Sequence, residues 1–146
     1  MMTKTWILIA DAHHAEIWTR KDHQQPEKAE LVEPSQKHRF RREIGSDRPG
    51  RAIASSDSRH AAIQPHVDLL ETEHRHFARE LAKHLHDGFA RHEFDRLAII
   101  AAPKMLGLVR DSLDPALAKA LTADIAKDLV KLPPGEIRGQ ILALIP

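Results

Sequence analysis

The chain has 146 residues, which is enough for one domain with an ordinary hydrophobic core. Its formal net charge is only +1, so any affinity for nucleic acid must come from a local concentration of charge. The absence of cysteine excludes disulfides, thiolate catalysis and cysteine-ligated zinc. No apolar run approaches the roughly 20 residues of a membrane span and none resembles a secretion signal, so we expect a cytoplasmic protein without membrane insertion.

The first part of the chain predicts a three-stranded antiparallel meander. Residues 5–10 are apolar on both faces, which is typical of a central strand. Residues 15–20 follow after only four polar or small residues, and two strands so closely connected pair as a hairpin. A third strand is expected at 29–33, before Pro34.

A long polar segment, residues 36–62, separates this meander from the strongest helix signal, at about 67–91. A segment of this length inside one domain is usually functional or partly disordered. Along the helix, apolar residues recur at three- to four-residue spacing and predict one buried stripe, with a solvated polar face opposite. The members of the stripe are Leu70, Phe77, Leu81, Leu85 and Phe89.

The rest of the chain alternates strand and helix signals. A fully apolar strand at 97–102 leads into a helix at 103–112, which Pro103 suits as a first-turn residue. A short helical piece at 115–120, a strand at 125–130 and a closing helix from Pro133-Pro134 to Leu144 follow. The resulting order, βββαβαβα, predicts a single α/β domain over residues 1–146, with a mixed sheet of about five strands and helices packed on it.

Positive charge is concentrated in the polar segment. Its basic side chains can contact phosphate, and arginine can do so through two parallel hydrogen bonds. Three carboxylates offset part of that charge, so a solvated loop with local ion pairs is the alternative interpretation. Only Phe40 is aromatic there, which favours contact with the phosphate backbone over base stacking. The candidate RNA- or phosphate-binding residues are Lys37, Arg39, Arg41, Arg42, Arg48, Arg51 and Arg59, and the loop motif comprises Ser46, Asp47, Arg48, Pro49, Gly50, Arg51 and, beyond them, His60.

Other chemistry-bearing residues allow weaker hypotheses. Mixed sheets of the ribonuclease H type hold two divalent metals with carboxylates, and Asp11, Glu73 and Asp128 could take those roles. Asp11 is also an ordinary hairpin residue and Asp128 an ordinary charge on the last strand. Glu73, His76, Glu80 and His84 share a helix face that could form half a metal site, but a solvated face is favoured. His60 could act as a general base, although no partner can be assigned. We therefore expect no metal, no cofactor and no assignable catalytic residue.

Six short segments along the chain form a recognisable set: residues 6–12 (WILIADA), 46–51 (SDRPGR), 77–82 (FARELA), 94–97 (FDRL), 102–107 (APKMLG) and Asp128-Leu129. They resemble the bacterial host-attachment protein family, and the resemblance covers essentially the whole chain. That family looks like a distant relative of the central domain of archaeal and eukaryotic peptide-chain release factors and of Pelota.

The resemblance to release factors implies a function as well as a fold. Release factors place a Gly-Gly-Gln loop just before a long helix, and here the loop Asp47–Arg51 precedes the predicted helix in the same order. The sequence contains no Gly-Gly-Gln, so hydrolysis of peptidyl-tRNA is not implied. What remains implied is a noncatalytic regulator that engages the ribosome, tRNA or rRNA and affects attachment indirectly. A metal-dependent nuclease and a protein-interaction module in surface attachment are the alternatives.

Overall fold

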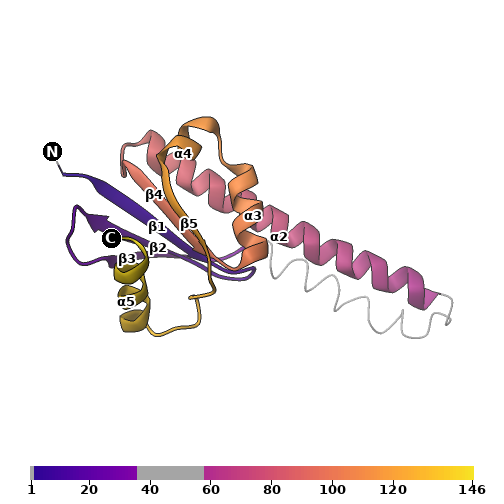
Figure 1. Cartoon of the computed structure of the whole chain (residues 1–146). Coiled ribbons are helices and arrows are strands. Elements are labelled where there is room, and N and C mark those ends of the chain that lie inside the picture. The colour runs from indigo at the N-terminus through magenta and orange to yellow at the C-terminus, as the bar shows by residue number, and fades with distance from the viewer. Residues whose placement is uncertain (1, 36–57) are drawn as a thin grey trace.

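A computed structural model describes residues 2–35 and 58–146, and of residues 58–68 only the backbone. Five strands form one mixed sheet in the order β3-β2-β1-β4-β5 (Figure 1). The predicted single α/β domain with a five-stranded mixed sheet is thereby confirmed. The strands are β1 (Lys4–Ala10), β2 (Ala15–Lys21), β3 (Glu27–Val32), β4 (Arg96–Ala101) and β5 (Leu121–Ala126).

The N-terminal meander is confirmed, and Asp11 closes its first turn. β1 and β2 pair antiparallel with Ala10 opposite Ala15, and β2 pairs antiparallel with β3. The carboxylate Oδ1 of Asp11 accepts hydrogen bonds from the backbone N–H groups of His13 and His14, at 2.8 and 2.7 Å. An aspartate that bonds to the backbone two residues on stabilises a tight turn.

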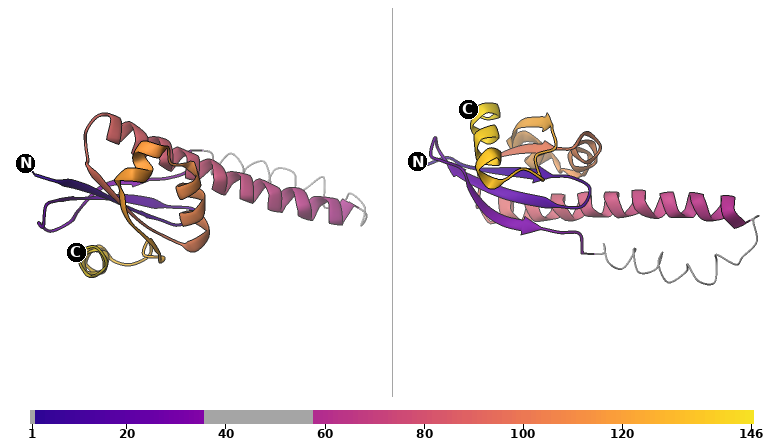
Figure 2. Two further views of the ribbon diagram at one scale, coloured as in Figure 1. Left: turned by 45° about the horizontal axis from the view of Figure 1, so that its top comes forward. Right: turned by 90° about the horizontal axis from the view of Figure 1, so that it is seen from below.

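Helices cover both faces of the sheet. β1 pairs parallel with β4, and β4 pairs parallel with β5. Alternate residues of β1 point to opposite faces, so Leu8 packs in one core and Ile7 in the other. Helices α2 (Ser58–Ala90), α3 (Pro103–Ser112) and α4 (Pro115–Ala120) supply the first core, and α5 (Pro134–Leu144) supplies the second, on the other side of the sheet (Figure 2).

Helix α2 is much longer than the sheet that it covers. Its 33 residues extend about 50 Å at 1.5 Å per residue. Phe77, Leu81 and Leu85 of the predicted stripe are fully buried against the sheet, whereas the N-terminal half of the helix projects beyond it (Figure 1). Among the described helices, none is both long and apolar enough to cross a membrane.

Two predicted boundaries are wrong. Helix α2 begins at Ser58 and not near residue 67, and it therefore includes Pro65, although proline lacks the backbone N–H of a helix interior residue. The last strand covers 121–126 and not 125–130, so Asp128 lies in the connection that follows it. The alternating burial of β5 is typical of an edge strand, and the apolar residues after it pack beneath α5.

Trp6 of β1 sets how closely α2 approaches the sheet. Its ring stacks on Phe94 with ring centroids 4.6 Å apart and lies beneath Gly88 of α2. A Cβ atom at Gly88 would lie 2.6 Å from Cη2 of Trp6, which is far inside van der Waals contact. The absence of a side chain at this position is therefore what allows the helix and the ring to touch.

We predict that Gly88→Ala destabilises the protein by about 1–3 kcal/mol, because a new methyl group in a packed core forces side chains or the helix to shift. Urea unfolding followed by circular dichroism measures the change. Gly139→Ala in α5 is the matched control, since nothing lies within 4 Å of its Cβ position. That substitution should stabilise the helix by about 0.5–1 kcal/mol. Equal effects of the two substitutions would contradict the proposed contact.

Candidate functional site

The predicted basic segment lies mostly outside the described residues. The structure places only its last members, Arg59 and His60, which lie in the first turn of α2. That turn is at the end of the helix that projects farthest from the sheet (Figure 1). The other members are not described: Lys37, Arg39, Arg41, Arg42, Arg48, Arg51 and the loop Ser46–Arg51.

The two ends of the basic segment are nevertheless fixed relative to one another. The chain leaves the sheet at Ser35, whose Oγ donates a hydrogen bond of 2.7 Å to Oε1 of Glu80 on α2. The backbone N–H of Ser35 bonds to the other oxygen of the same carboxylate at 3.3 Å. The chain re-enters at Ser58, 22 residues before Glu80 on that helix, which corresponds to about 33 Å. Of the described residues that flank the segment, Ser35 therefore lies beside the body of the domain and Ser58 at the tip of the projecting helix.

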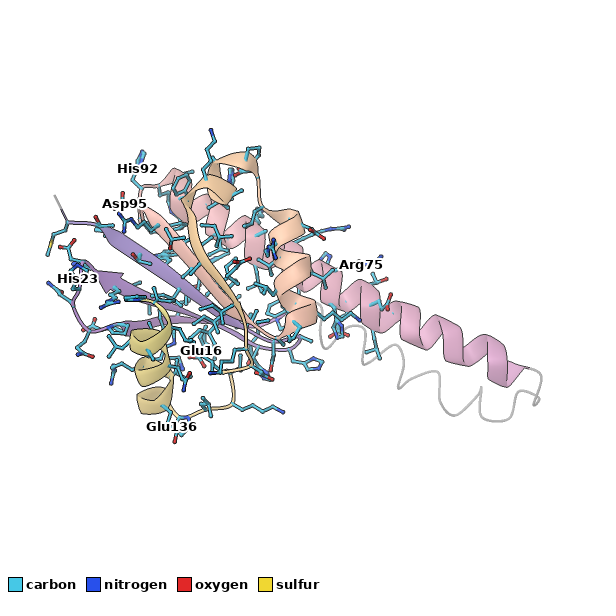
Figure 3. All side chains as sticks on the ribbon, viewed as in Figure 1. Glu16, His23, Arg75, His92, Asp95 and Glu136 are labelled. Atoms are coloured by element: carbon cyan, nitrogen blue, oxygen red, sulfur yellow. The ribbon has the colours of Figure 1, made fainter. Side chains whose placement is uncertain are left out.

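A line of exposed cations on α2 continues from the projecting part onto the body. Arg75, Arg79 and Lys83 follow one another at four-residue spacing and so lie on one side of the helix (Arg75 is labelled in Figure 3). Arg75 is 3.9 Å from Glu71, whereas Arg79 and Lys83 have no ion pair among the described residues. Arg79 and Lys83 also line an open cleft of about 360 Å³ between α2 and the α3–α4 junction. Sequence reasoning missed this line, although its spacing was visible.

Asp114 attaches the α4 side of the cleft to α2. His86 of α2 lies 2.7 Å from Asp114, measured from Nδ1 to Oδ2. The other oxygen of Asp114 accepts a hydrogen bond of 2.8 Å from the backbone N–H of Leu117 and so caps α4. The Asp114 carboxylate thus joins the start of α4 to α2, while Arg79 and Lys83 stay exposed to solvent.

The three carboxylates of the nuclease hypothesis do not form a metal site. Asp11 is buried and already accepts two backbone hydrogen bonds in its turn. Glu73 is buried on α2, and Asp128 is exposed in the connection after β5. Throughout residues 2–35 and 58–146, no group of three or more histidine, aspartate or glutamate side chains is arranged to hold a metal ion.

The polar stripe predicted on α2 is solvated only in part. Glu73 is 3% exposed, so the expectation of a solvated face is wrong at that residue. His76 and Glu80 form the expected local pair at 3.4 Å. His84 is half-buried, stacks on Trp6 and lies 2.9 Å from Glu30 of β3. The stripe therefore helps to attach α2 to the edge of the sheet.

Two histidines meet where the projecting helix leaves the sheet. His13 of the β1–β2 turn and His74 of α2 pack edge to face, with ring centroids 5.7 Å apart. The pKa of His74 is lowered from its ordinary value of 6.5, first by burial and then by the positive charges of His13 and Lys104. Glu73 and Glu71 oppose this effect in part. Neither Nδ1 atom of the histidine pair has a hydrogen-bond partner in the described part of the chain.

The geometry defines a class of protein: a single α/β domain with a five-stranded mixed sheet and one long helix that projects beyond it. The chain belongs to the family described as "Protein required for attachment to host cells", which it matches over residues 6–141. The predicted resemblance to the host-attachment family is thereby confirmed.

A curated relative can be aligned with part of the chain. An uncharacterised protein of Rickettsia prowazekii (strain Madrid E) is 44% identical over 71 residues. The aligned part is 47% of this chain and 47% of that protein. The match therefore spans about half the length of the curated relative.

The lowered pKa of His74 predicts that the fold loses stability as the pH falls below 6.5. The unfolded chain binds a proton on this residue at a higher pH than the folded chain does, so acid favours unfolding. His74→Gln should reduce the loss of unfolding free energy between pH 7.5 and 5.5, measured by urea titration. His23→Gln, at an exposed site, is the control and should keep the wild-type dependence. A His74→Gln variant with an unchanged pH dependence would exclude this linkage.

Proposed function

We propose that this protein is a noncatalytic RNA- or ribosome-associated regulator that contacts phosphate through its basic segment. The observation that carries the proposal is the separation of charge along the chain. Residues 37–59 hold seven basic and three acidic side chains, whereas the remainder holds 15 basic and 18 acidic ones. Residues 37–59 therefore carry a net charge of +4 and the remainder of the chain carries −3, so the excess of positive charge lies in this one segment.

The position of the segment supports the proposal. The described residues that flank it, Ser35 and Ser58, lie about 33 Å apart along α2, a distance that spans many phosphates of a nucleic-acid duplex. Arg75, Arg79 and Lys83 extend the same positive track toward the body of the domain. Contacts of this kind bind the backbone without reading bases, which suits the single aromatic residue in the segment.

The order of elements supports the ribosome as the partner. A loop at Asp47–Arg51 followed by the long helix α2 is also the order found in the release-factor central domain that the family resembles. Because the sequence has no Gly-Gly-Gln, the proposal assigns binding and not peptide release.

The attachment phenotype in the family description is then an indirect effect. In this proposal the protein acts in the cytoplasm on RNA or ribosomes, and changed expression of other proteins alters attachment. A direct protein partner is the alternative. Affinity capture before and after ribonuclease treatment separates the two, because a partner that survives the nuclease would favour direct protein interaction.

We predict that replacing Arg41, Arg42, Arg48 and Arg51 together by alanine weakens co-sedimentation with ribosomes by at least tenfold at moderate salt. Removing four phosphate contacts should also lower the slope of log affinity against log salt concentration by about 3. Sedimentation across a salt series measures both quantities.

The control variant removes the same amount of charge from elsewhere. Lys21, Arg91, Lys119 and Lys131 are all exposed and lie outside the basic segment and the α2 line. Their replacement by alanine should leave the salt slope within about one unit of the wild type. Unchanged ribosome binding by the four-arginine variant, or equal losses of binding in that variant and the control, would contradict the proposal.

A further inference from the structure

A second cavity, of about 490 Å³, lies at the ends of the strands that point away from the projecting helix. It lies where β1 and β4 begin and β2 ends, and the C-terminal end of α5 closes one side. Figure 3 labels His23 at this end of the molecule, far from Arg75 on α2. The volume is within the range of small-molecule sites. The polar lining comprises Thr3, Thr5, Arg20, His23, Arg96 and Thr122, together with Asp22.

The sheet register places two of these arginines on either side of a threonine. Thr5 of β1 is the direct partner of Arg20 on β2 and of Arg96 on β4. Cross-strand partners point to the same face, so the three side chains form a row on the face that α5 covers. Adjacent strands are about 4.8 Å apart, so the backbones carrying the two guanidinium groups are separated by about 10 Å. At that spacing, the guanidinium groups of Arg20 and Arg96 can both reach one anion that lies above Thr5.

The positive charge in this row has no protein counter-ion among the described residues. Arg20 is only 8% exposed, and its Nε and Nη1 donate to the carbonyls of Gln24 and Ile145, both at 2.8 Å. Neither Arg20 nor Arg96 has a carboxylate within 4 Å in the part of the chain that the structure describes. Asp22 is the acidic side chain among the described residues that line the cavity, and its Oδ1 accepts a hydrogen bond of 2.8 Å from the backbone N–H of Thr3. Arg20 is a buried cation without a carboxylate partner among the described residues, and Arg96 beside it is exposed, so the row favours an anion from outside the chain.

We propose that this cavity binds a small molecule that carries a phosphate group. The guanidinium group of Arg96 supplies forked donors that match phosphate oxygens, the Nη2 group of Arg20 can add a further donor, and Thr5 lies on the strand between the two arginines. The cavity is larger than one phosphate requires, and Ala123, Leu144 and Ile145 give part of it an apolar wall. An organic group joined to the phosphate can pack against that wall.

Thermal unfolding in the presence of inorganic phosphate tests the charge row. At constant ionic strength, 10 mM phosphate should raise the Tm of the wild type, because a ligand that binds only the folded state stabilises it. Arg96→Ala should abolish that rise, and without phosphate its Tm should equal or exceed the wild type, since one of two like charges is gone. Arg91→Ala, also an exposed arginine, should keep the full rise.

Calorimetric titration tests the organic part of the ligand. Adenosine monophosphate should bind at least tenfold more tightly than inorganic phosphate, and adenosine should not bind. Thr5→Val, which keeps the shape but removes the hydroxyl, should weaken binding of the monophosphate severalfold. No response of the wild type to phosphate, a rise retained in Arg96→Ala, or equal binding of adenosine and its monophosphate would each overturn the proposal. The basic-segment variant should keep this binding, because it leaves every described lining residue of the cavity unchanged.

Discussion

The packing of the C-terminal half of α2 against the central strands is the constraint on which the rest of the structure depends. Phe77, Leu81 and Leu85 are fully buried there, and Gly88 lets the helix approach Trp6 without a side chain between them. Once this half of the helix is fixed on the sheet, the other half must project, because the helix is longer than the strands. The direction and reach of the projecting part of α2 follow from that one interface.

Paired and unpaired charges lie close together on α2. His86 is paired with Asp114 at the start of α4, and Arg75 lies 3.9 Å from Glu71. Arg79 and Lys83, which lie between Arg75 and His86 in the helix, have no ion pair among the described residues. Exposed cations without a partner in the protein remain available to an external anion.

Much of the fold could be predicted from periodicity and turn chemistry. The meander, the strand at 96–101, the helices at 103–112 and 115–120 and the buried stripe of α2 all follow from local patterns. The last strand could not be placed, because Leu129 and Val130 are apolar for a different reason: they pack under α5. Of the candidate phosphate-binding and loop residues, only Arg59 and His60 fall within the described residues. The three carboxylates of the nuclease hypothesis and the helix-face residues His76, Glu80 and His84 are also described, and they do not gather into a metal site.

The sequence by itself determined the class of fold, the membership of the family and the concentration of arginine before the long helix, since all three are properties of residue type and spacing. Tertiary structure alone decided which charges meet. The position of Glu73 on the polar face of the helix predicts a surface residue, yet its side chain is buried where α2 leaves the sheet. Arg20, Thr5 and Arg96 are far apart in the chain and become neighbours only through strand register. Register depends on which strands pair, and no local pattern specifies the pairing of strands that lie 90 residues apart.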